Sequence, residues 1–92
     1  MIDRRVRVTN PTGLHLRPAG VFCNEAMKFD SRVTFTYGKD GSSEANAKSI
    51  LSILGACIHP GDEIDIVCEG PDEQEALNAL VSLIEGGLGE PV

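Results

Sequence analysis

Hydrophobic and polar residues alternate along two stretches of the chain, as in β-strands that bury one face. Residues 2–9 and residues 63–69 both follow this period of two. Residues 32–37 are rich in β-branched and aromatic side chains. The turn residues 38–41 lead from them into a short strand that runs through Ala45. The sequence therefore predicts four strands.

Apolar residues at helical spacing predict a first helix. In residues 19–29 they recur every three or four positions, and Asp30 with Ser31 breaks the pattern. The stripe that faces the core consists of Ala19, Phe22, Cys23, Ala26, Met27 and Phe29. Pro18 suits the first helical turn, where its missing N–H is not needed.

Two further helices are predicted from their ends. Residues 46–54 form a short helix stopped by Gly55, and either Asn46 or Ser49 is its N-cap. A third helix opens at residues 70–71, carries acidic residues in its first turns and ends at a pair of glycines. Its apolar stripe consists of Ala76, Leu77, Leu80, Val81 and Ile84.

The predicted elements follow the order βαββαβα, which indicates a two-layer α+β fold with the helices on one face of the sheet. With 92 residues, 41% of them hydrophobic, the chain is expected to form a single domain, residues 1–92. No apolar run approaches the roughly 20 residues that span a bilayer, and the N-terminus lacks a signal-peptide stretch. We therefore expect a soluble, cytoplasmic protein that does not insert into a membrane.

Charge is unevenly distributed along the sequence. Residues 1–48 hold eight basic and five acidic residues, whereas residues 49–92 hold nine acidic and no basic ones, for a total of −6. Such a chain lacks the basic composition that phosphate contacts require, so no nucleic-acid partner is expected. The acidic C-terminal helix is interpreted as a solvated surface.

The cysteines and the second histidine suggest no additional chemistry. Cys23, Cys57 and Cys68 are odd in number, widely spaced and in apolar settings, which favours buried thiols in a reducing compartment over disulfides or metal ligands. His59 lies in a turn rich in proline and glycine and is interpreted as a loop residue.

The strongest candidate for chemistry is His15. It stands after the turn residues 10–13 and directly before a predicted helix, where backbone N–H groups lack partners and the helix dipole is positive. A strand, a loop and a helix start form the usual geometry of an anion site. A phosphoryl group on this imidazole would be well held.

Three segments carry a resemblance to a known family. The run Gly13 to Ala19, the segment 46–51 and the helix opening at residues 70–71, at these separations, resemble HPr, the histidine-containing phosphocarrier of the bacterial sugar phosphotransferase system. The resemblance covers essentially the whole chain. It implies an open-faced sandwich of a four-stranded antiparallel sheet and three helices. It also implies a histidine that takes a phosphoryl group from phosphorylated enzyme I and hands it to sugar-specific IIA domains.

By this resemblance His15 is phosphorylated on Nδ1, and the Arg17 guanidinium contacts the phosphoryl oxygens. The backbone N–H groups of Leu16 and Arg17 are expected to bind the same anion. Because phosphoryl transfer depends mainly on positioning and charge stabilisation, no cofactor or metal on this chain is required. A carrier that moves between partners is expected to be a small monomer.

The second segment implies regulation and docking. Ser49 aligns with the family's regulatory serine, the target of HPr kinase/phosphorylase, and a phosphate there would add about two negative charges to the surface that docks enzyme I. The alternative is a serine that only caps its helix. Ile50, Leu51 and Leu54 match the family's exposed docking patch, whereas Ile53 is expected to point inward.

One residue departs from the family pattern, and two other functions stay open. Leu16 stands where the family usually has a small residue, so it would enlarge the apolar rim of the site and affect partner choice. The protein could instead be a regulatory or nitrogen-branch relative that acts by docking to kinases or transcription regulators. A further alternative is a ferredoxin-like small-ligand or interaction domain in which the histidine motif is accidental.

Overall fold

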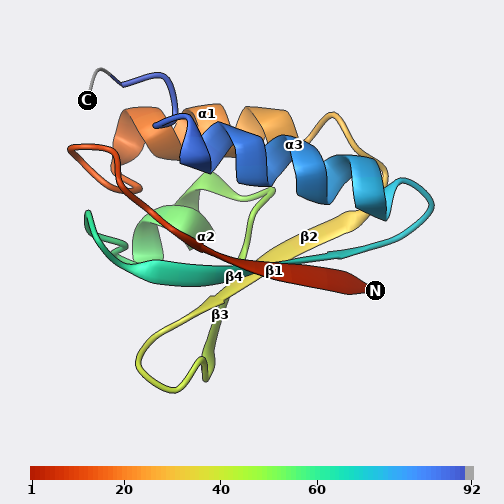
Figure 1. Cartoon of the computed structure of the whole chain (residues 1–92), viewed down its shortest axis with the longest axis horizontal. Helices are drawn as coiled ribbons and strands as arrows, with labels where there is room; N and C mark the ends of the chain where they lie inside the picture. The colour runs from red at the N-terminus through yellow and green to blue at the C-terminus, as the bar shows by residue number, and fades with distance from the viewer. Residues whose placement is uncertain (91–92) are drawn as a thin grey trace.

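The structure is a computed structural model that describes residues 1–90, so residues 91–92 of the predicted domain lie outside the described residues. The elements follow the predicted order (Figure 1). They are β1 (Ile2–Arg7), α1 (Leu16–Ala26), β2 (Arg32–Tyr37), β3 (Ser43–Asn46), α2 (Ile50–Gly55), β4 (Glu63–Glu69) and α3 (Glu73–Glu85).

The four strands form one sheet in the order β1-β4-β2-β3, and every neighbouring pair is antiparallel. Val6 pairs with Ile64, while Phe35 pairs with Ile66 on one side and Ala45 on the other. All five of these residues are buried, so the register lines up the apolar positions on one face.

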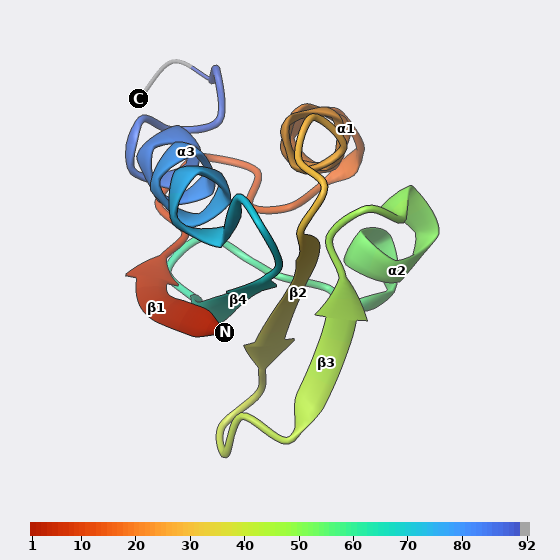
Figure 2. The same ribbon diagram turned by 90° about the vertical axis from the view of Figure 1, so that its right-hand side faces the viewer.

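The helices cover that apolar face. Viewed from the end, α1 and α3 lie side by side above the sheet, and α2 lies beside α1 near β3 (Figure 2). Phe22 of α1 packs edge-on against Phe35 of β2, with ring centroids 6.0 Å apart. The predicted two-layer α+β architecture is confirmed.

Helix α1 begins and ends three residues earlier than predicted. Leu16 and Arg17 are exposed, so they add no apolar periodicity from which the start could be read. After Ala26 the chain continues in turns, and the Phe29 N–H donates to the Ala26 carbonyl (3.2 Å). Met27, predicted in the buried stripe, is therefore 60% exposed, whereas Phe29 still packs against the core.

The start of α2 resolves the choice of N-cap. Ser49 is the cap, because its Oγ accepts a hydrogen bond from the Ser52 N–H (3.3 Å). Asn46 instead ends β3, where it pairs with Thr34, and its Oδ1 accepts from the Lys48 N–H (2.9 Å). The helix consequently begins directly after Ser49 and is shorter than predicted.

The expectation of three buried thiols is wrong for one of them. Cys23 and Cys68 are buried, but Cys57 is exposed. Cys57 follows α2 in the left-handed conformation (φ 52°), and its N–H donates to the Leu54 carbonyl (3.2 Å). Because a left-handed residue turns the chain away from the helix end, the apolar neighbours of Cys57 in sequence do not bury it.

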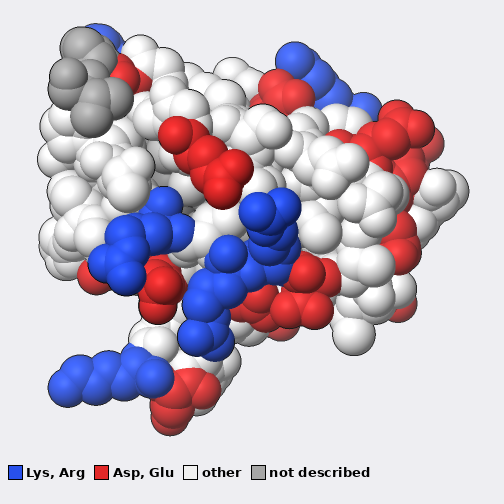
Figure 3. Space-filling view, in the orientation of Figure 1, with Lys and Arg blue, Asp and Glu red and all other residues white. Residues whose placement is uncertain are grey.

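The basic and acidic halves of the sequence mix in space. Arg4 of β1 lies 3.8 Å from Glu85 of α3, and Arg7 lies 3.5 Å from Glu63 of β4. Figure 3 shows this face, where lysine and arginine side chains gather beside carboxylates. Exposed pairs of this kind contribute about 1 kcal/mol or less each. The acidic side of the C-terminal helix is exposed to solvent, as predicted, and Glu85 on that side also faces Arg4.

Candidate functional site

A rigid turn delivers the chain to the start of α1. Gly13 has φ +64°, and a Cβ added there would fall 2.5 Å from the Ile58 carbonyl oxygen. Leu14 is buried, and its N–H donates to the same carbonyl (3.1 Å). Only glycine fits this close approach without strain. The segment that leads to His15 is thus packed against the chain that follows α2.

His15 is the N-cap of α1. Its backbone is extended (φ −77°, ψ −178°), its side chain makes no capping hydrogen bond, and the residue is exposed. The first helical bond runs from the Ala19 N–H to the His15 carbonyl (2.8 Å), and Pro18, which has no N–H, precedes it. The N–H groups of Leu16 and Arg17 therefore stand at the helix start ahead of the first intrahelical bond.

The surroundings of this helix start favour an anion. No acidic residue lies in the first turn of α1. Arg17 is exposed, and within residues 1–90 its guanidinium forms no ion pair. The structure thus places His15 at the helix start, with Arg17 and two backbone N–H groups in the first turn that follows it. Such a set can hold a phosphoryl group on the imidazole.

One residue of the site has no signal in the sequence. Glu90, beyond the last helix, accepts hydrogen bonds from Asn10 and Thr12 of the turn before His15. These hydrogen bonds, with a smaller contribution from Arg17, lower the pKa of Glu90 from its ordinary value. The contact joins residues about 80 positions apart, so local pattern analysis could not find it.

Helix α2 presents apolar side chains near the site. Leu51 is 83% exposed and Ile50 38%, while Ile53 is buried as predicted. Leu54 is half-buried and packs against the core, so it exposes less apolar surface to a partner than the resemblance implies. Leu16, at the start of α1, is 63% exposed. Exposed apolar side chains on the adjacent helices α1 and α2 are typical of a docking surface.

The other histidine, His59, is an exposed loop residue, as predicted. Its N–H donates to Asp62 Oδ2 (2.9 Å). Across residues 1–90, no group of three or more histidine, cysteine, aspartate or glutamate side chains could hold a metal ion. None of the helices in that range is long and apolar enough to cross a membrane.

Comparison with known proteins places the chain in a family. The family model for the PTS HPr component phosphorylation site matches residues 2–86. The HPr-like protein Crh of Halalkalibacterium halodurans is 42% identical over 85 residues, which cover 92% of this chain and 98% of that protein. The phosphocarrier protein HPr of Treponema pallidum is 37% identical over 90 residues, covering 98% and 99%.

Structural similarity agrees with these matches. The crystal structure of HPr-C-His from Thermoanaerobacter tengcongensis superimposes with a TM-score of 0.91 at 40% identity, and all of both chains is covered. An antiparallel four-stranded sheet covered by three helices, with an exposed histidine at a helix start, is the architecture of a phosphocarrier. The chain belongs to the HPr family of the phosphotransferase system.

Proposed function

We propose that this protein accepts a phosphoryl group from phosphorylated enzyme I on His15 and passes it to IIA domains of the sugar phosphotransferase system. The observation that carries the proposal is the start of α1, where the exposed His15 is the N-cap and two backbone N–H groups precede the first intrahelical bond. Arg17 in the first turn is exposed, and within residues 1–90 its guanidinium forms no ion pair. The transfer is a displacement: Nδ1 of His15 bonds to phosphorus as the bond from phosphorus to the donor breaks. A second displacement delivers the group: a nucleophile of the acceptor bonds to phosphorus as the bond from phosphorus to Nδ1 of His15 breaks.

The positive groups at the helix start supply the electrostatic part of this transfer. Phosphoryl transfer needs little covalent chemistry from the protein, because positioning and charge stabilisation dominate. The N–H groups of Leu16 and Arg17 would bind equatorial phosphoryl oxygens, and the exposed Arg17 side chain is free to approach as the group arrives. No metal or cofactor on this chain enters the proposal.

The test is phosphorylation with enzyme I and phosphoenolpyruvate, followed by mass spectrometry. The native protein should gain one acid-labile phosphate, and His15→Ala should gain none. His59→Ala is the matched control, because it removes the chain's other exposed histidine and should leave phosphorylation intact. An acid-labile phosphate that persists in His15→Ala would refute the proposal.

Leu16, Ile50 and Leu51, with the half-buried Leu54, are proposed to dock enzyme I and the acceptors. Leu51→Ala should raise the KM for phosphorylated enzyme I about fivefold, because it removes an apolar contact with the partner. The melting temperature should change little, because the Leu51 side chain is mostly exposed to solvent. Ile53→Ala is the contrast: burial predicts a loss of about 2–5 kcal/mol of stability. Equal KM values for Leu51→Ala and the native protein would exclude Leu51 from the docking surface.

Ser49 is proposed as a regulatory phosphorylation site for HPr kinase/phosphorylase. Its Oγ already accepts the Ser52 N–H at the start of α2, so a phosphate would sit at that helix end and beside the docking surface. Incubation with the kinase and ATP should phosphorylate the native protein and Ser52→Ala but not Ser49→Ala. Ser49→Asp should lower transfer from enzyme I about tenfold. Unchanged transfer in Ser49→Asp would argue for a capping role alone.

A second candidate function is favoured by the 42% identity to the HPr-like protein Crh. In that case the protein acts mainly by docking to regulators, with Ser49 as its modified residue. Phosphorylation by the kinase without any phosphate on His15 from enzyme I would favour this function. A monomeric state and a cytoplasmic location remain predictions; light scattering of the purified protein tests the first.

A further inference from the structure

Glu90 holds the turn that precedes His15. Its Oε1 accepts hydrogen bonds from Asn10 Nδ2 (2.7 Å), the Thr12 hydroxyl (2.7 Å) and the Thr12 N–H (3.2 Å). Three donors from two residues of one turn converge on a single carboxylate oxygen. Hydrogen bonds to a charged acceptor are stronger than neutral ones. Glu90 therefore binds the turn as a unit.

Asn10 links Glu90 to the backbone of Gly13, two residues before His15. It is 1% exposed, and its Nδ2 also donates to the Gly13 carbonyl (2.8 Å). Two acceptors thus fix the orientation of the Asn10 amide, and one of them is the Glu90 carboxylate. On its other side Gly13 abuts the Ile58 carbonyl. The segment leading to His15 is held between Ile58 and the Asn10–Glu90 pair.

Glu90 is itself held in place. Leu88, two residues before it, is buried, and its N–H donates to the Leu83 carbonyl of α3 (2.9 Å). The Glu90 N–H donates to the Gly87 carbonyl (3.0 Å). The C-terminal segment returns from α3 to the end of the molecule where α1 begins (Figure 1). The carboxylate is thus fixed to the core rather than carried on a free tail.

We propose that Glu90 is a positioning residue for phosphoryl acceptance: it fixes the turn of residues 10–13, and through it the position of His15 in front of the N–H groups of α1. This inference rests on the proposed function. Glu90 lies beyond residues 2–86, which the family model matches, so the role does not follow from the family match. Misplacement of a reacting group by a fraction of an ångström to 1 Å slows a transfer that depends on alignment.

The test compares three variants of the full chain. Glu90→Ala removes the acceptor and should lower kcat for phosphoryl transfer from phosphorylated enzyme I about tenfold, with KM unchanged because the docking helices are untouched. Glu90→Gln keeps an amide oxygen as acceptor and should retain transfer within about twofold of native. Glu85→Ala, which removes an exposed carboxylate of α3 that faces Arg4, is the matched control and should behave as native.

Hydrogen exchange gives a readout that does not need enzyme I. The Thr12 N–H should exchange about tenfold faster in Glu90→Ala than in the native protein or Glu85→Ala. Native rates of transfer and of Thr12 exchange in Glu90→Ala would overturn the inference. An equal loss of transfer in Glu90→Gln and Glu90→Ala would also overturn it, because the charge of Glu90 alone would then be responsible. A native protein that takes no phosphate on His15 would overturn the proposed function and this inference with it.

Discussion

The starts of α1 and α3 both follow a turn, and neither N-cap side chain makes a capping hydrogen bond, but they differ in the charges that the chain places there. At α3 the chain supplies its own anions. Asp72 accepts hydrogen bonds from the N–H groups of Asp30 and Ser31 (both 2.9 Å) and from the Ser31 hydroxyl. Glu73 accepts the Gly70 N–H (3.1 Å) and faces the N-terminal amino group. These carboxylates bind neighbouring segments rather than the N–H groups of α3, but with Glu75 they make this helix start acidic.

At α1 the chain supplies none. The N-cap is a histidine without a capping hydrogen bond, and no acidic residue follows in the first turn. The nearby carboxylate, Glu90, is directed to the turn before the helix by Asn10 and Thr12. A helix start without acidic residues keeps the positive end of its dipole available to an anion from outside the chain, whereas an acidic start repels one.

The largest expected effect comes from making α1 resemble α3. Arg17→Glu places a carboxylate in the first turn of α1 and removes the guanidinium. Transfer from phosphorylated enzyme I should fall about 100-fold, because a stabilising charge is replaced by a repelling one. Single-turnover phosphorylation measures the rate.

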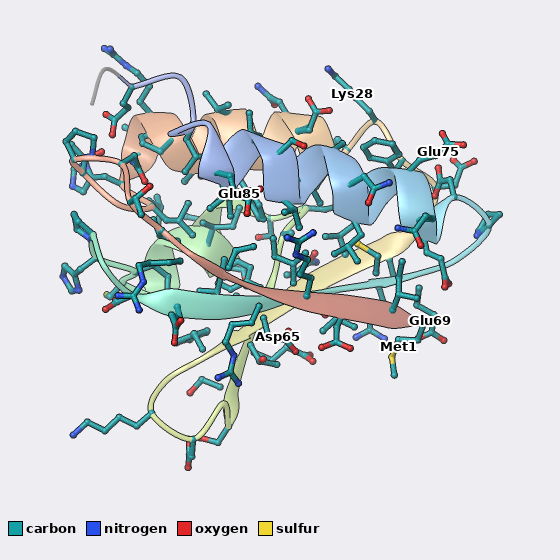
Figure 4. All side chains as sticks on the ribbon, viewed as in Figure 1. Met1, Lys28, Asp65, Glu69, Glu75 and Glu85 are labelled. Atoms are coloured by element: carbon teal, nitrogen blue, oxygen red, sulfur yellow. The ribbon has the colours of Figure 1, made fainter. Side chains whose placement is uncertain are left out.

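The control reverses a charge at the acidic start of α3. Glu75 lies in the first turn of α3, at the opposite end of that helix from Glu85 (Figure 4). Glu75→Lys should leave transfer unchanged and cost about 0.5 kcal/mol of stability. If Arg17→Glu transfers phosphate as fast as the native protein, the contrast between the helix starts has no functional meaning.

A smaller effect follows from removing the carboxylate that joins the start of α3 to the turn after α1. Asp72→Ala removes the acceptor of two N–H groups and one hydroxyl, so the melting temperature should fall by about 5 °C while transfer through His15 is retained. Circular dichroism melts check the first part. A melting temperature equal to that of the native protein would mean that these hydrogen bonds add nothing net.

Acid should weaken the same region. Hydrogen bonds from Ser31 and Asp30 lower the pKa of Asp72 below its ordinary 3.8. The Gly70 N–H and the N-terminal amino group likewise lower the pKa of Glu73 below 4.5. Stability from such groups is complete above their ordinary values and is lost as pH falls through the lowered ones.

The gap in melting temperature between the native protein and Asp72→Ala should therefore stay constant from neutral pH to about 4 and narrow as the pH falls from about 4 to about 2. A series of thermal melts across this range measures the gap. A gap that stays constant over the whole range would show that the Asp72 charge contributes nothing to the fold.

The smallest effect is a difference in thiol reactivity. Burial, with added repulsion from Glu73 and Asp72, raises the pKa of Cys68 to about 11, so its thiolate is scarce near neutral pH. An aromatic disulfide reagent should modify the exposed Cys57 rapidly and Cys68 only on unfolding. Cys57→Ser should abolish the fast reaction. A fast phase that survives this change would contradict the burial of the other thiols.

The sequence predicted most of the fold because its strands and helices repeat with clear periods. It also predicts that His15 and Arg17 lie at a helix start, and both do, because they are only two positions apart in the sequence. The predictions that are wrong lie at the ends of helices. Apolar spacing that continues beyond α1 predicts a buried Met27, and apolar neighbours predict a buried Cys57, but both residues are exposed. Glu90 was missed because its partners lie about 80 residues away.

Two-dimensional amide NMR tests directly whether the N–H groups at the start of α1 receive the phosphoryl group. On phosphorylation of His15, the Leu16 and Arg17 amide protons should move strongly downfield, while those of Glu73 and Gln74 at the acidic start of α3 stay in place. Unmoved Leu16 and Arg17 resonances in a fully phosphorylated protein would contradict the account.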